Sequence, residues 1–135
     1  MGYTHYWNNS EFPQDEWNNI LADAKALIAA ADIALCRFGD DNDSPALDSE
    51  GIILNGWKDE GHETFALSRY TDDEFCKTAA KPYDLLVASI LAVAADRSDH
   101  IAVSSDGGLD DWADALRFAS ETLGREIAFP CGGES

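Results

Sequence analysis

Residues 82–96 read PYDLLVASILAVAAD, and this stretch decides how the rest of the chain is arranged. Apolar side chains fill almost every position from 85 to 95, interrupted by Ser89. Pro82 suits the first turn of a helix, and a helix that is apolar on nearly all sides is buried. We therefore expect a central helix from Pro82 to about Asp96, too short to cross a bilayer.

Two amphipathic helices are expected on either side of this central one. The first follows Pro13, and its apolar stripe consists of Trp17, Ile20, Leu21, Ala24, Leu27, Ile28 and Ala31. The second runs over residues 109–123, with a stripe of Trp112, Ala115, Leu116, Ala119 and Leu123. Asp110 and Asp111 suit its N-terminus, and Gly124 suits its C-cap.

Five strands are expected, over residues 3–8, 33–38, 52–57, 64–68 and 100–104. Residues 39–50 are rich in Asp, Ser and Asn and are expected to form a loop. The order is β-α-β-β-β-α-β-α. This order predicts a single α+β domain over residues 1–135, in which an antiparallel or mixed sheet of about five strands packs with three helices. The tail after about residue 125 is expected to be loose.

Charge is the most unusual feature of the composition. Twenty-six acidic residues against nine basic ones give a net charge of −17, while 45% hydrophobic residues argue against disorder. Such a surface repels nucleic acids and anionic lipids, so neither is an expected partner. The acidity fits solubility or a salty habitat, mimicry of nucleic acid toward a basic partner, or cation binding.

The three cysteines, Cys36, Cys76 and Cys131, lie far apart and form no Cys-x-x-Cys pair. An odd number with this spacing argues against a disulfide framework. Residues 1–10 have neither a basic nor an apolar region typical of a signal peptide. We expect a cytoplasmic protein with reduced thiols.

Basic residues gather just before the central helix, where Arg69, Lys77, Thr78 and Lys81 lie within thirteen positions. Acidic side chains normally occupy a helix N-terminus, so lysines there fit a bound anion, such as a phosphate. Alternatively, the lysines pair with nearby carboxylates, namely Asp72, Asp73, Glu74 and Asp84. No Walker or Rossmann glycine pattern accompanies them.

Two further groups of residues are candidates for ligand contacts. Ser105 and Asp106 lie in the segment SSDGG, between a strand and a helix, which is either a plain turn or an anion-binding turn. The other group is rich in aromatic and imidazole rings that either stack on a planar ligand or pack in the core. Its members are Tyr3, His5, Tyr6, Trp7, Trp57 and His62.

Catalytic and metal motifs are weak. His62-Glu63 lacks the second histidine of a zincin, and the aspartates at residues 40–48 with Glu50 lack EF-hand spacing. We expect no metal and no cofactor. A nucleophile formed by Cys76 with His5 or His62 remains an open alternative.

Three segments carry a resemblance to a family of small, uncharacterised phage and bacterial proteins. They are MGYTHYW at residues 1–7, FCKTAAKPYD at residues 75–84 and SSDG at residues 104–107. The resemblance implies a phage or prophage product that acts in the bacterial cytoplasm. Small phage proteins of this kind often counter host defence, and some sequester nucleotide signals.

The function that we expect is sequestration of a phosphorylated, nucleotide-like molecule without turnover. Lys77, Lys81 and Arg69 would contact phosphate, an aromatic ring would stack on the planar group, and self-association would complete the pocket. One alternative is an acidic inhibitor that binds a basic face of a host protein. Another is a small nucleotide-directed hydrolase or transferase that uses His62-Glu63 or Asp106 as acid and base.

Overall fold

The computed structural model describes residues 3–39 and 42–131. Within these residues, three α-helices and seven short strands make up an α+β fold, which confirms the predicted class. Along the chain the elements are β1 (Thr4–Asn9), α1 (Gln14–Ala30), β2 (Leu35–Cys36), β3 (Ala46–Leu47), β4 (Gly51–Gly56), the 3-10 helix η1 (Lys58–Glu60), β5 (Phe65–Ser68), β6 (Asp72–Lys77), α2 (Asp84–Arg97), β7 (Ile101–Ser105) and α3 (Leu109–Leu123).

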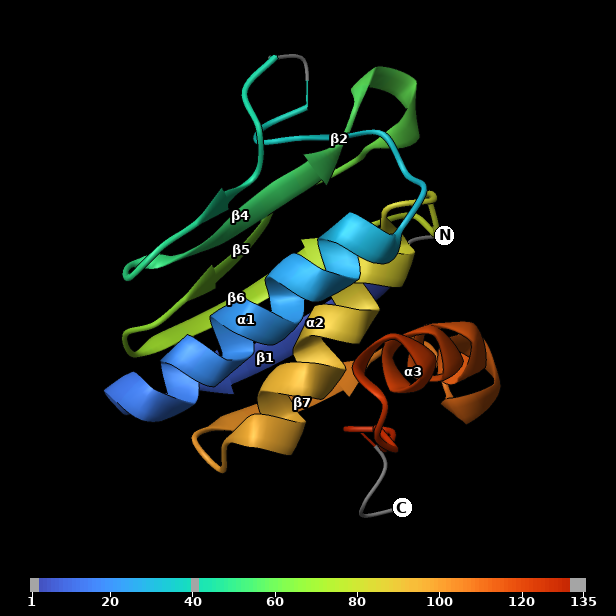
Figure 1. Ribbon diagram of the computed structural model, residues 1–135. Helices are drawn as coiled ribbons and strands as arrows, with labels where there is room; N and C mark the ends of the chain where they lie inside the picture. The colour runs from blue at the N-terminus through green and yellow to red at the C-terminus, as the bar shows by residue number, and fades with distance from the viewer. Residues whose placement is uncertain (1–2, 40–41, 132–135) are drawn as a thin grey trace.

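The strands form two antiparallel sheets. In one, β1 lies between β6 and β7; in the other, β4 pairs with β2, β3 and β5. Asn9 links them, because its side-chain amide donates to the carbonyls of Ser68 and Tyr70 between β5 and β6. Figure 1 shows β4, β5, β6 and β1 following one another on one side of the molecule, with the helices on the other side.

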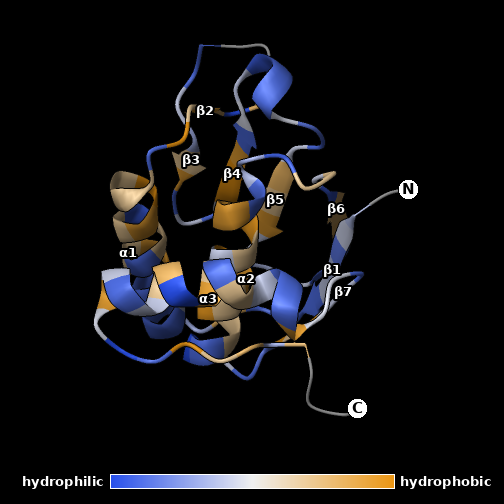
Figure 2. Ribbon diagram, turned by 90° about the vertical axis from the view of Figure 1, so that its right-hand side faces the viewer, coloured by the Kyte–Doolittle hydropathy of each residue, from blue (hydrophilic) through white to orange (hydrophobic). Residues whose placement is uncertain are grey.

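The core lies between the sheets and the helices, with α2 at its centre. Every residue of α2 from Leu86 to Ala94 is buried, as the apolar pattern predicted. The helices α1 and α3 both pack against α2, and each contributes a fully buried tryptophan, Trp17 and Trp112. Figure 2 shows the hydrophobic colouring gathered in α2, β4 and β5.

The expected last helix is confirmed, and from His5 onward buried and exposed side chains alternate along β1. His5 and Trp7 of β1 are buried, whereas Tyr6 between them is exposed. The bounds of α3 match the expected range, and Gly124 ends it with φ of 72°, a left-handed conformation that favours glycine.

Two strands were not predicted. β6 carries four consecutive residues that are mostly solvent-exposed, so its sequence lacks the alternation typical of a strand. It is a strand because its backbone pairs with β1 along six residues. β3 lies within the expected loop, and the strand expected at residues 33–38 is limited to the two residues of β2.

Candidate functional site

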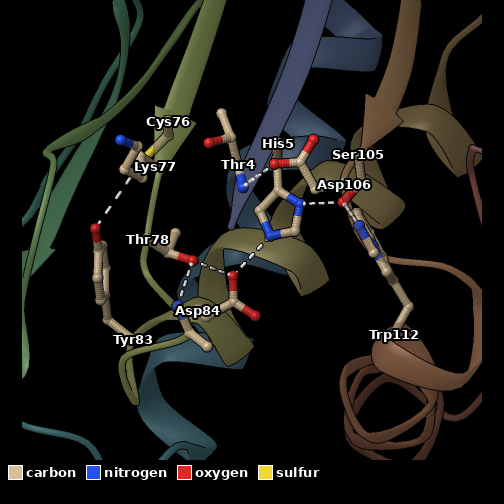
Figure 3. Close-up of polar contacts among 12 residues, drawn as sticks. Thr4, His5, Cys76, Lys77, Thr78, Tyr83, Asp84, Ser105, Asp106 and Trp112 are labelled. Atoms are coloured by element: carbon tan, nitrogen blue, oxygen red, sulfur yellow. Dashed lines mark hydrogen bonds and ion pairs between the residues drawn. The ribbon is translucent and has the colours of Figure 1, made fainter. Parts of the chain in front are cut away.

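The strand register brings three distant residues into one row at the end of the first sheet. His5 of β1 lies opposite Cys76 of β6 on one side and opposite Ser105 of β7 on the other. Asp84, the first residue of α2, lies against the same end of the sheet, where its side chain meets the His5 ring. Side chains from both ends of the chain therefore meet here (Figure 3).

His5 is fully buried and bridges a hydroxyl and a carboxylate. Its Nδ1 lies 2.8 Å from Ser105 Oγ, and its Nε2 lies 2.6 Å from Asp84 Oδ1. The rings of Tyr3 and Trp112 each meet the imidazole edge to face, with centroids 5.0 Å away. The imidazole is thus held by two hydrogen bonds and two aromatic neighbours.

Ser105 has hydrogen-bond partners besides His5. Ser105 Oγ accepts the backbone N–H of Gly107 at 3.0 Å and the indole N–H of Trp112 at 3.2 Å. The side chain of Tyr3 also hydrogen-bonds to Ser105. Ser105 Oγ therefore joins His5 Nδ1 to the turn that follows β7, to α3 and to Tyr3.

This Ser–His–Asp row resembles a hydrolytic triad in composition, but the two ring nitrogens are exchanged: Ser105 faces Nδ1 and Asp84 faces Nε2, the reverse of the catalytic arrangement. The Ser105 oxygen also accepts two N–H donors, from Gly107 and Trp112. The backbone N–H groups that follow it are also occupied: Asp106 donates to Thr4 O, Gly107 to Ser105 Oγ and Gly108 to Asp111 Oδ2. No oxyanion hole is formed by these three amides.

Cys76 is not positioned as a nucleophile. Its Sγ donates to the Glu63 carbonyl, and burial raises the pKa of the thiol to about 12. A thiol with this pKa stays protonated at neutral pH, and the thiolate is the reactive form. The arrangement therefore disfavours the Cys76–His5 alternative.

The loop between β6 and α2 shapes the site. Thr78 Oγ1 donates to Asp84 Oδ1 at 2.6 Å and accepts the backbone N–H of Ala80 at 3.3 Å. The backbone N–H groups of Thr78 and Ala79 both point to the Tyr3 carbonyl. Ala79 and Ala80 have φ of 54° and 56°, a left-handed conformation that non-glycine residues rarely adopt.

Tyr3 lies beside this network as a neutral phenol. Burial, with a contribution from the Asp84 and Asp111 carboxylates, raises its pKa to about 12. A Cβ built on Gly107 would lie 2.3 Å from the Tyr3 hydroxyl oxygen, so a side chain at residue 107 would displace this ring. Tyr3 thus keeps its proton as a hydrogen-bond donor at neutral pH.

Lys58, Lys77 and Lys81 lie around the same loop. Lys81 Nζ donates to the Asp59 carbonyl at 3.1 Å, and the backbone of Lys77 accepts the N–H of Glu63. Among the described residues, none of these three lysines lies within ion-pair distance of a carboxylate. The expected alternative, pairing with Asp72, Asp73, Glu74 or Asp84, is therefore not seen there.

An exposed aromatic ring lies beside Lys58. Trp57 is 39% exposed, and Lys58 Nζ lies 4.5 Å from its ring centroid. The adjoining segment is held by the buried Asn55 amide, which bonds to the backbone of Gly56, Phe38 and His62. Gly61 packs so closely that a Cβ there would lie 2.3 Å from the Gly56 carbonyl oxygen.

The structure brings together some of the residues predicted from the sequence and separates others. Around the His5 network lie Tyr3, Thr78, Ser105 and Asp106, whose carboxylate accepts the Thr4 N–H at 3.1 Å. A second group consists of Lys77 and Lys81, with Trp57 and His62 on the neighbouring segment. The His62 side chain is exposed.

Three predicted residues lie elsewhere. Trp7 is buried against Phe65, and Tyr6 lies on the outer face of the sheet beside Phe75. Arg69 donates to the Phe12 carbonyl and the Gln14 side chain, near Glu11.

Asp84 and Trp112 are the central residues that the sequence did not assign to the site. The sequence suggested Asp84 only as an ion-pair partner for the lysines, and Trp112 only as part of the apolar stripe of α3. The signal for Asp84 was available in its position at the start of a buried helix. Its contact with His5, seventy-nine positions away, requires the fold.

Other kinds of site find little support in the described residues. No group of three or more His, Cys, Asp or Glu side chains there is arranged to hold a metal ion, although Asp40 and Asp41 lie outside the described ranges. None of the described helices combines the length and apolar character needed to span a membrane. The chain matches no protein-family model, no curated protein and no solved structure.

Proposed function

We propose that this protein binds and sequesters a phosphorylated, nucleotide-like small molecule at the loop of residues 77–84. The observation that carries the proposal is the group of three lysines, Lys58, Lys77 and Lys81, without a carboxylate partner among the described residues. In a chain of net charge −17, three such cations around one loop favour an anionic ligand there.

Trp57 supports a planar group on the ligand. Its partly exposed ring would stack on a base, and the Lys58 ammonium over the ring adds a cation–π contact. Lysine ammoniums bind phosphate as point charges and need no fixed geometry. The biological setting that we propose, a phage protein that removes a host-defence signal, rests on the family resemblance.

Binding without turnover is the form of the proposal that the side chains favour. Ser105 faces the wrong ring nitrogen of His5 for a triad and accepts two N–H donors, and the Cys76 thiol is protonated, so neither is prepared for nucleophilic attack. A ligand held here would therefore be released intact.

Isothermal titration calorimetry tests the proposal with nucleoside mono-, di- and triphosphates and with cyclic mono- and dinucleotides. The Lys77→Ala/Lys81→Ala variant should bind at least tenfold more weakly than the wild type. Lys25→Ala is the matched control, because Lys25 is exposed on α1 away from the loop, and it should bind unchanged. Mass spectrometry of the recovered nucleotide should find it intact.

Absence of heat with every nucleotide would overturn the proposal. So would an equal loss of affinity in the Lys25→Ala control, since the effect would then reflect net charge rather than a site. Conversion of the nucleotide to a product would replace sequestration by catalysis.

A further inference from the structure

The outward faces of the two sheets carry apolar side chains where a sheet face exposed to water is normally polar. In the second sheet, the register places Ala46 of β3, Ile53 of β4 and Ala66 of β5 in one row across three strands. In the first sheet, Tyr6 of β1 lies opposite Phe75 of β6, and these residues are 41% and 57% exposed. The described helices lie on the other side of the molecule (Figure 1), so none of them covers either row.

Both rows lie on the same side of the molecule. The strand residues next to them, such as Trp7 of β1 and Phe65 of β5, are buried, and these two rings pack against each other in the core. Side chains alternate between the two faces of a strand, so Tyr6 and Ala66 point away from that core. An exposed apolar surface that extends over two sheets is typical of a protein interaction site.

The row in the second sheet lines a hollow of about 210 Å³. Ala46 and Ala66 are small, so they leave space on both sides of Ile53. Pockets that enclose a whole small molecule usually measure about 300–1,000 Å³. This hollow is smaller, and its size suits one long side chain of a partner.

The charged residues that line the hollow are all acidic, namely Asp48, Glu50 and Asp72. Asp48 Oδ1 accepts the backbone N–H groups of Glu50 and Gly51, which holds the turn between β3 and β4. In the part of the chain that the structure describes, none of the three carboxylates lies within ion-pair distance of a basic group. An apolar lining beside carboxylates suits an aliphatic stem that ends in a cation.

Charge decides among the possible occupants of this face. A second copy of the chain would bring a net charge of −17 toward the same carboxylates, and nucleic acids and anionic lipids are repelled in the same way. Lys77, which is basic, lies at the opposite end of β6 from Asp72. A partner with positive charge is therefore favoured at the hollow.

We propose that the outward face of the two sheets is a docking surface for a basic protein. The partner inserts a lysine or arginine side chain into the hollow, where its stem contacts Ile53 and its cation meets the carboxylates. Apolar side chains of the partner pack on Tyr6 and Phe75. This inference does not depend on the nucleotide binding proposed above.

The probe is a displayed library of random peptides, selected on the whole chain of residues 1–135. Selected peptides are synthesised with a fluorescent label, and their affinities are measured by fluorescence anisotropy. They should carry a lysine or arginine next to apolar residues. Their binding should weaken as the salt concentration rises, because the charges at the hollow are partly exposed to solvent.

Ala66→Arg is the sharpest variant. It fills the hollow with a cation that belongs to the chain itself, and Ala66 is exposed, so the strand can accept the larger side chain. The selected peptides should bind at least about tenfold more weakly. Ala113→Arg is the matched control, because it adds the same charge at an exposed position of α3 and should leave their binding unchanged. Circular dichroism establishes that both variants are folded.

A second pair of variants tests the carboxylates and does not rely on Ala66→Arg being folded. Asp48→Asn/Asp72→Asn removes two charges and keeps side-chain oxygens that can accept the turn N–H groups. The peptides should bind about twofold to thirtyfold more weakly. Asp110→Asn/Glu121→Gln makes the same change of charge at exposed positions of α3 and should have no effect.

Several results would overturn the docking surface. They are failure to select any peptide, selection of peptides without lysine or arginine, and equal weakening by Ala66→Arg and Ala113→Arg. Sedimentation equilibrium tests the second copy: a wild-type dimer that Ala66→Arg dissociates would show that another copy of this chain covers the face. None of these results alters the calorimetric test of nucleotide binding, so the two proposals stand or fall separately.

Discussion

Ser105 is the residue on which the His5 network depends. Its hydroxyl forms a hydrogen bond with His5 Nδ1 and accepts N–H groups from Gly107 and Trp112. Ser105→Ala removes these three bonds and leaves two N–H donors without an acceptor. At about 1 kcal/mol per bond, the free energy of unfolding should fall by about 3 kcal/mol, as measured by urea denaturation with tryptophan fluorescence.

Ser104 supplies the control for this prediction. It precedes Ser105 on β7, but its side chain is exposed on the outer face of the sheet. Ser104→Ala should change the free energy of unfolding by less than about 0.5 kcal/mol. A similar loss in both variants would mean that the network contributes no more than an ordinary surface hydroxyl.

At the scale of elements, the loop between β6 and α2 stores conformational strain. Ala80 is exposed and left-handed, with φ of 56°, and its N–H bonds to Thr78. This conformation costs an L-residue about 1–2 kcal/mol, whereas glycine adopts it freely. Ala80→Gly should therefore raise the free energy of unfolding by up to about 1 kcal/mol, after the greater entropy of the unfolded chain is counted.

The same substitution in a helix should have the opposite sign. Ala113 is exposed inside α3, so Ala113→Gly should lower the free energy of unfolding by about 1 kcal/mol. Both variants can be compared by thermal denaturation. Equal destabilisation by the two substitutions would show that the Ala80 conformation carries no strain.

Elements were predictable where their signals are local. The apolar run from 85 to 95 identifies a buried helix by itself, and the stripe and end residues of α3 give its bounds. β6 was missed because Asp72, Asp73 and Glu74 resemble a solvated turn. Its strand conformation comes from pairing with β1, a contact across more than sixty positions that no local pattern records.

The residues of the candidate site were likewise predictable only where their signals are local. Lys77 and Lys81 could be found from their charge and their place before a helix. The bond between His5 and Asp84 depends on the register of three strands and on the position of α2. Sequence alone therefore identified several residues of the site but not the carboxylate at its centre.

At the scale of the whole molecule, an ion-pair cluster joins three distant segments. Asp23 of α1 is 7% exposed and accepts bonds from Arg97, at the end of α2, and from Arg125, after α3. Arg125 also pairs with Asp96. Burial alone would raise the pKa of Asp23, but the bonds from the two guanidinium groups outweigh it and hold the pKa below its ordinary value.

The direction of this pKa change fixes how the stability should depend on pH. Because the pKa of Asp23 is lower in the folded state, its ionised carboxylate stabilises the fold at pH values above 3.8, the pKa in the unfolded chain. This contribution is lost as the pH falls through the folded-state pKa. Asp23→Asn should lower the free energy of unfolding at pH 7 by about 2 kcal/mol, a value discounted because both arginines are about one-third exposed. In urea denaturation, the wild type and the variant should converge as pH decreases below 4. If the two free energies of unfolding instead differ by the same amount down to pH 2, the loss comes from packing, because charge pairing at Asp23 disappears once its carboxylate is protonated.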